Sequence, residues 1–372
     1  MDKPLNIVVS GLSITSAWGN GHATTYRALI GQLAEMGHEV TFLERDLPWY
    51  AANRDLPDPP FCRTVLYDSL SDLQRMCSGM IKAADFVLVG SYVRDGVQIG
   101  RWLLGTADCP VGFYDIDTPV TLAKLARADH EYLEPSLIPQ YAVYFSFTGG
   151  PTLEVLEDRY GSPMARALYC SVDISKYHPE HGLPCVFDLG YLGTYSEDRQ
   201  PTVSELLIEP ARRLADRQFV VAGAQYPDGI DWPSNVRHIE HVAPERHRVF
   251  YCAQRYTLNV TRQDMIRAGY SPSVRLFEAA ACGVPVISDY WPGLETFFRP
   301  DEEILIARSH KDTLAYLCDM PESRRRRIGE SARRRVLREH TSRVRARQFL
   351  AHVRQVISGR PEREPQRVDV AV

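Results

Sequence analysis

Residues 271–288 read SPSVRLFEAAACGVPVIS, a short helical pattern followed by an apolar run. Ser271 is a favourable N-cap, Pro272 suits the first helical position, and Gly283 is a typical helix stop. The segment VPVIS (284–288) that follows predicts a buried strand. A helix leading directly into a buried strand is the repeating unit of an α/β sheet.

The same alternation of short apolar strands and amphipathic helices extends from this segment through most of the chain. The predicted strands are 5–12, 39–44, 85–90, 111–116, 141–147, 187–193, 219–224, 256–261 and 284–288, and the clearest helices are 23–38, 69–83, 94–105 and 201–216. This alternation predicts the α/β class, with two Rossmann-like, doubly wound parallel-sheet domains that face a central cleft. Ligands of such sheets bind beyond the carboxyl ends of the strands, so we expect the functional residues in the loops there.

The length of 372 residues also favours two domains. The polar segment SVDISKYHPEHGLP (171–184) predicts a linker, and we expect it to act as a hinge. The predicted domains are 1–175 and 176–340. Residues 341–358 are expected to form a helix that packs back on the first domain, and 359–372 to be a disordered tail.

Composition and charge argue against several classes of protein. The formal net charge of −4 disfavours a nucleic-acid partner. The eight cysteines are scattered without a C-x-x-C pair, so they predict neither a disulfide framework nor a zinc site. The first residues lack a signal-peptide layout, and no run approaches the roughly 20 apolar residues of a membrane-spanning helix. We therefore expect a cytoplasmic protein without a transmembrane segment.

Residues 323–356 form an arginine-rich helical stretch near the C-terminus. The favoured interpretation is a solvated basic face above an apolar face packed inward. Peripheral contact with an anionic membrane stays open as an alternative.

Glu278 is a carboxylate leading into four small residues and a glycine, an environment in which a charged group needs a partner. It lies about two turns, or roughly 10 Å, beyond the predicted helix start. The free N–H groups at that start, near Ser271 and Ser273, suit an anion such as a diphosphate. Glu278 would then accept hydrogen bonds from ribose hydroxyls. The alternative is a salt bridge to Arg275 one turn earlier.

The segment SVRLFEAAACGVPVISDYWPGLETFF (273–298) resembles the donor-site signature of GT-B glycosyltransferases. The resemblance extends over roughly 185–345 and is strongest to the CgeB-like, spore-maturation type group related to glycosyltransferase family 4. It implies the GT-B fold, a nucleoside diphosphate sugar as donor, an unidentified acceptor, and no further cofactor. It also implies that Glu278 grips the ribose, with hexosyl transfer expected to be metal-independent. Family 4 enzymes usually carry a second glutamate eight positions earlier, where this chain has Tyr270, so the resemblance leaves retaining and inverting stereochemistry both open.

Two other activities remain open on the same fold. A nucleotide-sugar 2-epimerase would consume the donor without an acceptor. A non-catalytic nucleotide-sugar binding protein would bind the donor and turn nothing over.

Other donor-site candidates follow the strands of the second domain. Gly193 and Thr194 allow close backbone approach to a ligand. Arg199 is predicted to stabilise the leaving diphosphate and Arg262 to assist it, unless they are a surface charge and an ion-pair partner of Asp264. The loop that contains His241 and Val242 corresponds to the base-contacting loop of the family, although a plain strand-to-helix turn would look the same.

The acceptor candidates lie in the first domain. The loop 16–24 holds Gly19, Asn20, Gly21 and His22, and His22 is predicted to orient the acceptor or the leaving phosphate. A helix-capping or surface histidine is the alternative.

The segment FYDIDTP (113–119) contains Asp115 and Asp117 in a D-x-D pattern. Such a pair can hold a divalent cation. In a GT-B protein it would instead bind acceptor hydroxyls, with Asp117 as a base, and we favour this interpretation without a metal. Asp117 could also simply cap a helix whose first residue is Pro119.

Overall fold

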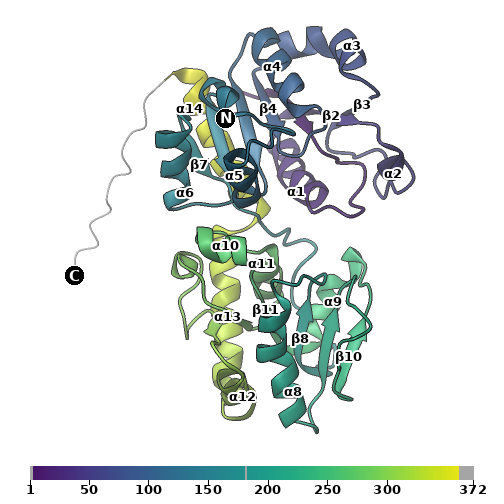
Figure 1. The fold of residues 1–372 in the computed structure, drawn as a ribbon, viewed down its shortest axis with the longest axis vertical. Helices are drawn as coiled ribbons and strands as arrows, with labels where there is room; N and C mark the ends of the chain where they lie inside the picture. The colour runs from purple at the N-terminus through teal and green to yellow at the C-terminus, as the bar shows by residue number, and fades with distance from the viewer. Residues whose placement is uncertain (1–2, 181, 360–372) are drawn as a thin grey trace, which may run out of the picture.

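The computed structural model describes residues 3–180 and 182–359, which form two α/β domains, one above the other in Figure 1. The first contains a seven-stranded, all-parallel sheet in the order β3-β2-β1-β4-β5-β6-β7. Its strands are β1 (Asn6–Gly11), β2 (Glu39–Arg45), β3 (Arg63–Tyr67), β4 (Phe86–Gly90), β5 (Val111–Asp115), β6 (Val143–Ser146) and β7 (Ala165–Ala167). The strand order reverses between β1 and β4, which is where ligands of doubly wound sheets bind.

The second domain repeats this plan with a six-stranded parallel sheet in the order β10-β9-β8-β11-β12-β13. Its strands are β8 (Phe187–Leu192), β9 (Phe219–Ala222), β10 (Val236–Ile239), β11 (Gln254–Asn259), β12 (Val286–Ser288) and β13 (Leu305–Ile306). The order reverses here between β8 and β11. The predicted pair of Rossmann-like doubly wound sheets is therefore confirmed.

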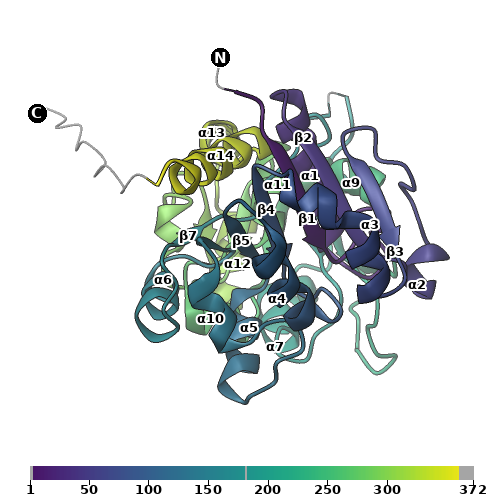
Figure 2. The ribbon, with the colours of Figure 1, turned by 90° about the horizontal axis from the view of Figure 1, so that it is seen from above.

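Helices cover both faces of each sheet (Figures 1 and 2). The first domain has α1 (His22–Glu35), α2 (Pro48–Ala51), α3 (Leu70–Lys82), α4 (Gly96–Thr106), α5 (Thr118–Ala126) and α6 (Pro151–Glu154), with a 3₁₀ segment at Pro135–Gln140 and a π-helical one at Val155–Arg159. The second has α7 (Gln200–Val203), α8 (Glu209–Arg213), α9 (His247–Cys252), α10 (Gln263–Ala268), α11 (Val274–Ala281), α12 (His310–Cys318) and α13 (Glu322–Glu339), with a π-helical segment at Ser204–Ile208 and 3₁₀ turns at Pro244–Arg246 and Leu294–Thr296. The last helix, α14 (Ser342–Ser358), belongs to the first domain in space.

The apolar strands explain this layering. Every residue of β4 and β5 is buried, as expected for parallel strands covered on both faces. One core lies on the α3 and α4 side of the first sheet, and a second lies on the α1 and α14 side. Phe349 of α14 packs against Phe86 and Phe145, with ring centroids 5.9 and 5.3 Å apart. The chain therefore crosses from the second domain back to the first.

The differences from the predicted elements lie at edges and ends. Four short strands, β3, β7, β10 and β13, carry too little pattern to be predicted, and each of them lies at a sheet edge. The helix predicted to begin beside Ser271 begins at Val274, with Ser273 as its N-cap. Ser271 instead accepts a hydrogen bond from the Thr148 hydroxyl at 3.0 Å, across the domain boundary. The predicted tail, apart from Gly359, lies outside the described residues.

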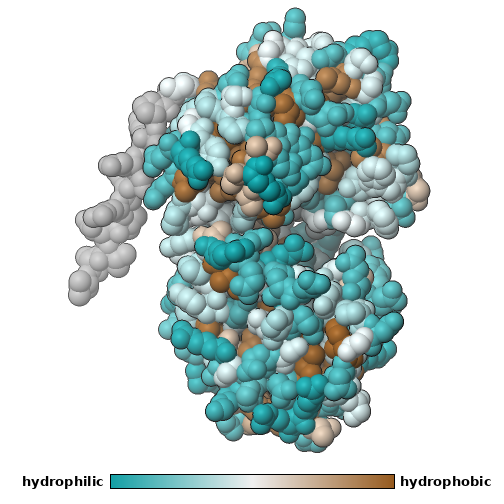
Figure 3. Space-filling view, viewed as in Figure 1, coloured by the Kyte–Doolittle hydropathy of each residue, from teal (hydrophilic) through white to brown (hydrophobic). Residues whose placement is uncertain are grey.

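The predicted linker is packed more closely than a free hinge. Val172 forms a β-bridge with Thr341, and Tyr177 is buried in the core of the second domain. A second connection lies beside the donor helix, where the Gly149 amide donates to the Tyr270 carbonyl at 3.0 Å. Figure 3 shows the surface hollowed between the two domains on one side. That hollow is the cleft onto which the carboxyl ends of both sheets open.

Candidate active site

At the carboxyl end of β8, in the second sheet, glycines allow close approach to the backbone. A side chain at Gly193 would meet the Tyr191 hydroxyl at 2.6 Å and Arg275 Nη2 at 2.9 Å. One at Gly223 would meet the Gly193 carbonyl at 2.0 Å. Thr194, the next residue, is exposed, and its carbonyl accepts a hydrogen bond from Arg199. Glycine is therefore required here for the backbones and the arginine to approach one another.

Three arginines gather at this edge. Arg199 and Arg275 are buried and Arg262 is exposed, and none has a carboxylate within 4.0 Å in the part of the chain that the structure describes. Burial and the positive charges of Arg275 and Arg262 lower the pKa of Arg199. Like charges held together without acids are costly, so the cluster suits an anion such as a diphosphate. Asp264, the alternative partner of Arg262, pairs with Arg267.

Glu278 does not pair with Arg275. Arg275 donates to the Leu192 carbonyl and, at 3.0 Å, to Asn259 Oδ1, and its guanidinium lies over the Tyr191 ring at 5.0 Å. The Glu278 carboxylate is 7% exposed and accepts a hydrogen bond from the Tyr251 hydroxyl at 2.9 Å. Burial and the charge of Glu278 together raise the pKa of Tyr177 of the linker. The salt-bridge alternative is therefore wrong, and Glu278 is a buried carboxylate without a cation among the described residues.

The loop after β10 contributes less definite contacts. His241 is exposed, and Val242 is half-buried with its carbonyl 3.1 Å from His247 Nε2. His247 Nδ1 lies 3.4 Å from the Tyr177 hydroxyl. A chain of polar contacts thus runs from the predicted base-contacting loop to the tyrosine beside Glu278.

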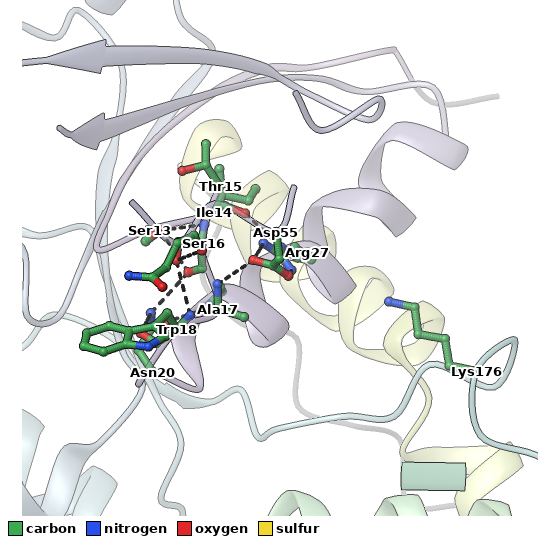
Figure 4. A network of polar contacts seen from close by, with 12 residues as sticks. Ser13, Ile14, Thr15, Ser16, Ala17, Trp18, Asn20, Arg27, Asp55 and Lys176 are labelled. Atoms are coloured by element: carbon green, nitrogen blue, oxygen red, sulfur yellow. Dashed lines mark hydrogen bonds and ion pairs between the residues drawn. The ribbon is translucent and has the colours of Figure 1, made fainter. Parts of the chain in front are cut away.

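On the first domain, the loop between β1 and α1 is held by two carboxylates. Glu44 is fully buried and accepts four hydrogen bonds from residues 13–15, at 2.6 to 3.0 Å. Asp55 accepts from the Ala17 amide at 2.8 Å and from Arg27 (Figure 4). A loop fixed by this many bonds is preorganised.

Within that loop, Asn20 is used structurally. Its Oδ1 accepts from the Ala23 amide at 3.0 Å, and its Nδ2 donates to the carbonyls of Ser16 and Trp18. Its side chain therefore pairs with a free amide in the first turn of α1 and has little left for an acceptor. Gly19 has a φ of 66° and supplies the turn, and Gly21 is the exposed N-cap.

His22, the first residue of α1, lies edge-on to Tyr92, with ring centroids 5.2 Å apart. Burial lowers its pKa from 6.5 to about 4, so the ring is neutral at pH 7. The Tyr92 hydroxyl donates to Asp117 Oδ2 at 3.3 Å. Tyr92 follows β4 and carries no sequence motif, so the sequence did not reveal it.

Asp117 and Asp115 differ in environment. Burial raises the pKa of Asp117, and the charge of Arg262 from the second domain opposes this rise. Asp117 is the N-cap of α5 and Arg262 the N-cap of α10, and these two helices are in contact across the domain boundary. Asp115 is fully buried and accepts from Tyr144 at 2.6 Å and Thr121 at 2.8 Å. Burial raises its pKa to about 6. Asp115 therefore does not present its carboxylate to an acceptor, contrary to the prediction.

The same geometry argues against the D-x-D interpretation, because only Asp117 of the pair faces the cleft. No cluster of three or more histidine, cysteine or acidic side chains suited to a metal occurs within residues 3–180 and 182–359.

Four buried polar atoms around the cleft have no protein partner in the described part of the chain: His22 Nδ1, Asp117 Oδ1, the Tyr191 hydroxyl and Arg199 Nε. Buried polar atoms in native proteins nearly always have one. These four lie at the facing ends of the two sheets, where a polar ligand between the domains would supply the missing partners.

Known proteins resemble this chain in sequence over residues 199–351 and in fold over nearly its whole length. Residues 199–351 match the family model described as glycosyl transferase-like. No curated protein matches the chain in sequence. Among the described residues, no helix is long and apolar enough to cross a membrane.

Solved structures match over nearly the whole chain at low identity. A sucrose-phosphate synthase from Thermosynechococcus elongatus has 16% identity and a TM-score of 0.68, covering 96% of this chain and 100% of its own. An alpha-glucosyltransferase solved with UDP-glucose and DNA has 13% identity and a TM-score of 0.70, covering 95% and 100%. Anabaena HepE, solved with UDP and glucose, has 12% identity and a TM-score of 0.67, covering 94% and 100%. The chain thus has the GT-B fold of these structures, and its residues 199–351 are similar in sequence to the glycosyl transferase-like family.

Proposed function

We propose that this protein transfers a hexosyl group from a UDP-sugar to a hydroxyl acceptor. The observation that carries the proposal is the set of unpartnered buried polar atoms around the cleft, which includes one from each predicted catalytic residue, His22, Asp117 and Arg199. UDP is proposed because Anabaena HepE and the alpha-glucosyltransferase, which share the fold, were solved with UDP or UDP-glucose.

The second domain would bind the donor. Arg199, Arg262 and Arg275 have no carboxylate within 4.0 Å among the described residues and would hold the diphosphate. As the sugar leaves, these groups stabilise the charge on the departing phosphate, an electrostatic contribution that needs no metal. Glu278 would accept the ribose hydroxyls, held in place by Tyr251.

The first domain would bind the acceptor. Asp117 faces Arg262 across the cleft, and its raised pKa makes its carboxylate a stronger base than an exposed aspartate. The neutral His22 ring would orient the acceptor through Nδ1, which has no protein partner among the described residues. We also propose that the protein belongs with the CgeB-like group, on the sequence of 273–298 and on Tyr270 in place of the family 4 glutamate.

The test is UDP-sugar turnover by the full chain, with and without candidate acceptors. UDP-glucose and related UDP-hexoses are incubated with the protein and a panel of glycan and small-molecule alcohols, and released UDP and sugar products are measured. Acceptor-dependent UDP release with a glycosylated product supports the proposal. An isomerised nucleotide-sugar without an acceptor would indicate the epimerase, and tight UDP binding without turnover would indicate the binding protein.

A further inference from the structure

Tyr92 has a backbone conformation that a large side chain rarely adopts. It lies two residues after β4 with a φ of 62°, in the left-handed region, and Asp95 in the same loop has a φ of 56°. This conformation is unfavourable for any residue with a Cβ. Such strain persists only where the surrounding structure imposes it, and it concentrates at functional sites.

The Tyr92 ring is fixed on three sides. It stacks on Tyr132, with centroids 4.8 Å apart and planes 28° apart. The Lys124 ammonium lies over both rings, 5.9 and 5.4 Å from their centroids. His22 meets the Tyr92 ring edge-on from the end of α1. The strained backbone thus places the Tyr92 ring between the two loops that contain the acceptor candidates.

Tyr92 touches both of those candidates. Its ring contacts His22, and its hydroxyl donates to one oxygen of Asp117, Oδ2. The other oxygen, Oδ1, and His22 Nδ1 are the atoms without a protein partner among the described residues. Tyr92 therefore contacts both groups, and its hydrogen bond uses one Asp117 oxygen and leaves the other without a partner among the described residues.

We propose that Tyr92 is a positioning residue of the acceptor site, which holds Asp117 and His22 so that Asp117 Oδ1 and His22 Nδ1 converge on one acceptor hydroxyl. The inference rests on the proposed function and adds the residue that sets its acceptor geometry. The groups that face Asp117 are the Tyr92 hydroxyl, Asp115 two residues earlier, and Arg262 and Asp264 of the second domain. Replacing Tyr92 by phenylalanine removes only the first.

The test compares Tyr92→Phe with Tyr132→Phe in the full chain. Tyr132 is the matched control, because it belongs to the same stack but its hydroxyl lies 2.7 Å from Thr121 Oγ1 and has no hydrogen bond to Asp117 among the described contacts. The Asp117 carboxyl is titrated by carbon NMR with labelled aspartate, and its signal is assigned with Asp117→Asn. This measurement needs no acceptor and no turnover.

Tyr92→Phe should move the Asp117 titration to higher pH by about half a unit or more, since a hydrogen bond to the carboxylate is lost. Tyr132→Phe should leave it in place. UDP affinity should change less than about twofold in either variant, and turnover with an acceptor found by the screen should fall about tenfold in Tyr92→Phe alone.

An unchanged Asp117 titration in Tyr92→Phe, or an equal shift in Tyr132→Phe, would overturn the inference. Failure of the wild-type protein to bind or turn over UDP-sugars would instead refute the proposed function, and the titration would still report on Tyr92. The thermal midpoint of each variant shows whether it is folded as the wild type is.

Discussion

Replacing Glu278 by glutamine should weaken nucleotide binding and leave the folded protein as stable or more stable. Glu278 is buried and has no cation within 4.0 Å among the described residues, and its carboxylate accepts a hydrogen bond from the Tyr251 hydroxyl. A buried carboxylate without a cation opposes folding. Removing the charge should therefore raise the unfolding free energy by up to about 1 kcal/mol, or about 2–4 °C in midpoint.

The loss in binding follows from the same geometry. A hydrogen bond to a charged group contributes about 1.5–3 kcal/mol, and glutamine retains one acceptor oxygen. If Glu278 accepts two ribose hydroxyls, UDP affinity should fall by about 2–4 kcal/mol, or roughly 30- to 1,000-fold. The assay is titration calorimetry with UDP and 2′-deoxy-UDP. The wild-type protein should prefer UDP, and Glu278→Gln should lose most of that preference.

Glu303→Gln is the matched control. Glu303 is also a buried glutamate, 3% exposed, but it pairs with Arg299 at 3.1 Å and lies away from the cleft residues. Its replacement should lower the thermal midpoint and leave UDP affinity unchanged. The reasoning is refuted if Glu278→Gln behaves as Glu303→Gln does, since Glu278 would then be a structural carboxylate. Equal losses of UDP and 2′-deoxy-UDP affinity would exclude the 2′-hydroxyl as its partner.

Four further outcomes are expected. Turnover should persist in EDTA. If turnover is instead lost in EDTA, restored by manganese and abolished by Asp117→Ala, the D-x-D interpretation would be revived. His22→Ala should depress transfer with little change in UDP affinity, whereas Arg199→Met should lower both about tenfold or more. Calorimetry measures the UDP affinity, and UDP release measures the transfer. Burial lowers the pKa of His340 from 6.5 to about 3, so protonation of this ring favours the unfolded chain. Chemical denaturation should therefore show the unfolding free energy falling as the pH drops from 6.5 toward 3, and this pH dependence should be weaker in His340→Gln. Tyr92→Gly should be more stable than Tyr92→Ala by about 1 kcal/mol in the same experiment, the reverse of the usual order, because only glycine adopts a φ of 62° without strain.

The fold was predictable because its signals are local. Apolar runs such as Phe86–Gly90 and Val111–Asp115 are read directly from the sequence, and their alternation with helices leaves few topologies. Glu278 could be singled out because a charge beside small residues conflicts with its neighbours. Its actual partner, Tyr251, lies 27 positions away in the sequence, and no local sequence pattern predicts such a contact.

The errors have the same origin in contacts between distant segments. Ser271 has the residue type of an N-cap, but its hydroxyl is taken by Thr148 of the other domain, and the helix starts three residues later. Asp115 and Asp117 form a D-x-D motif in the sequence. The fold buries the first against Tyr144 and leaves the second at the cleft. Tyr92 was missed because a positive φ is a property of the backbone that the tyrosine itself does not encode.

Tyr270, the residue that stands where family 4 enzymes carry a glutamate, shows how the donor helix is fixed relative to the first domain. Its φ is 46°, and its ring fills the space between Gly150 of the first domain and Gly293 of the second, where a side chain at either glycine would meet the ring at 2.3 or 2.5 Å. The Gly149 amide donates to its carbonyl, and α11 begins four residues later. The first domain is thus attached to the segment that carries the donor helix, independently of the linker. Since Tyr177 of the linker is itself buried in the second domain, a movement that opens the cleft would have to pivot at this contact and at the bridge between Val172 and Thr341, rather than bend freely within 171–184.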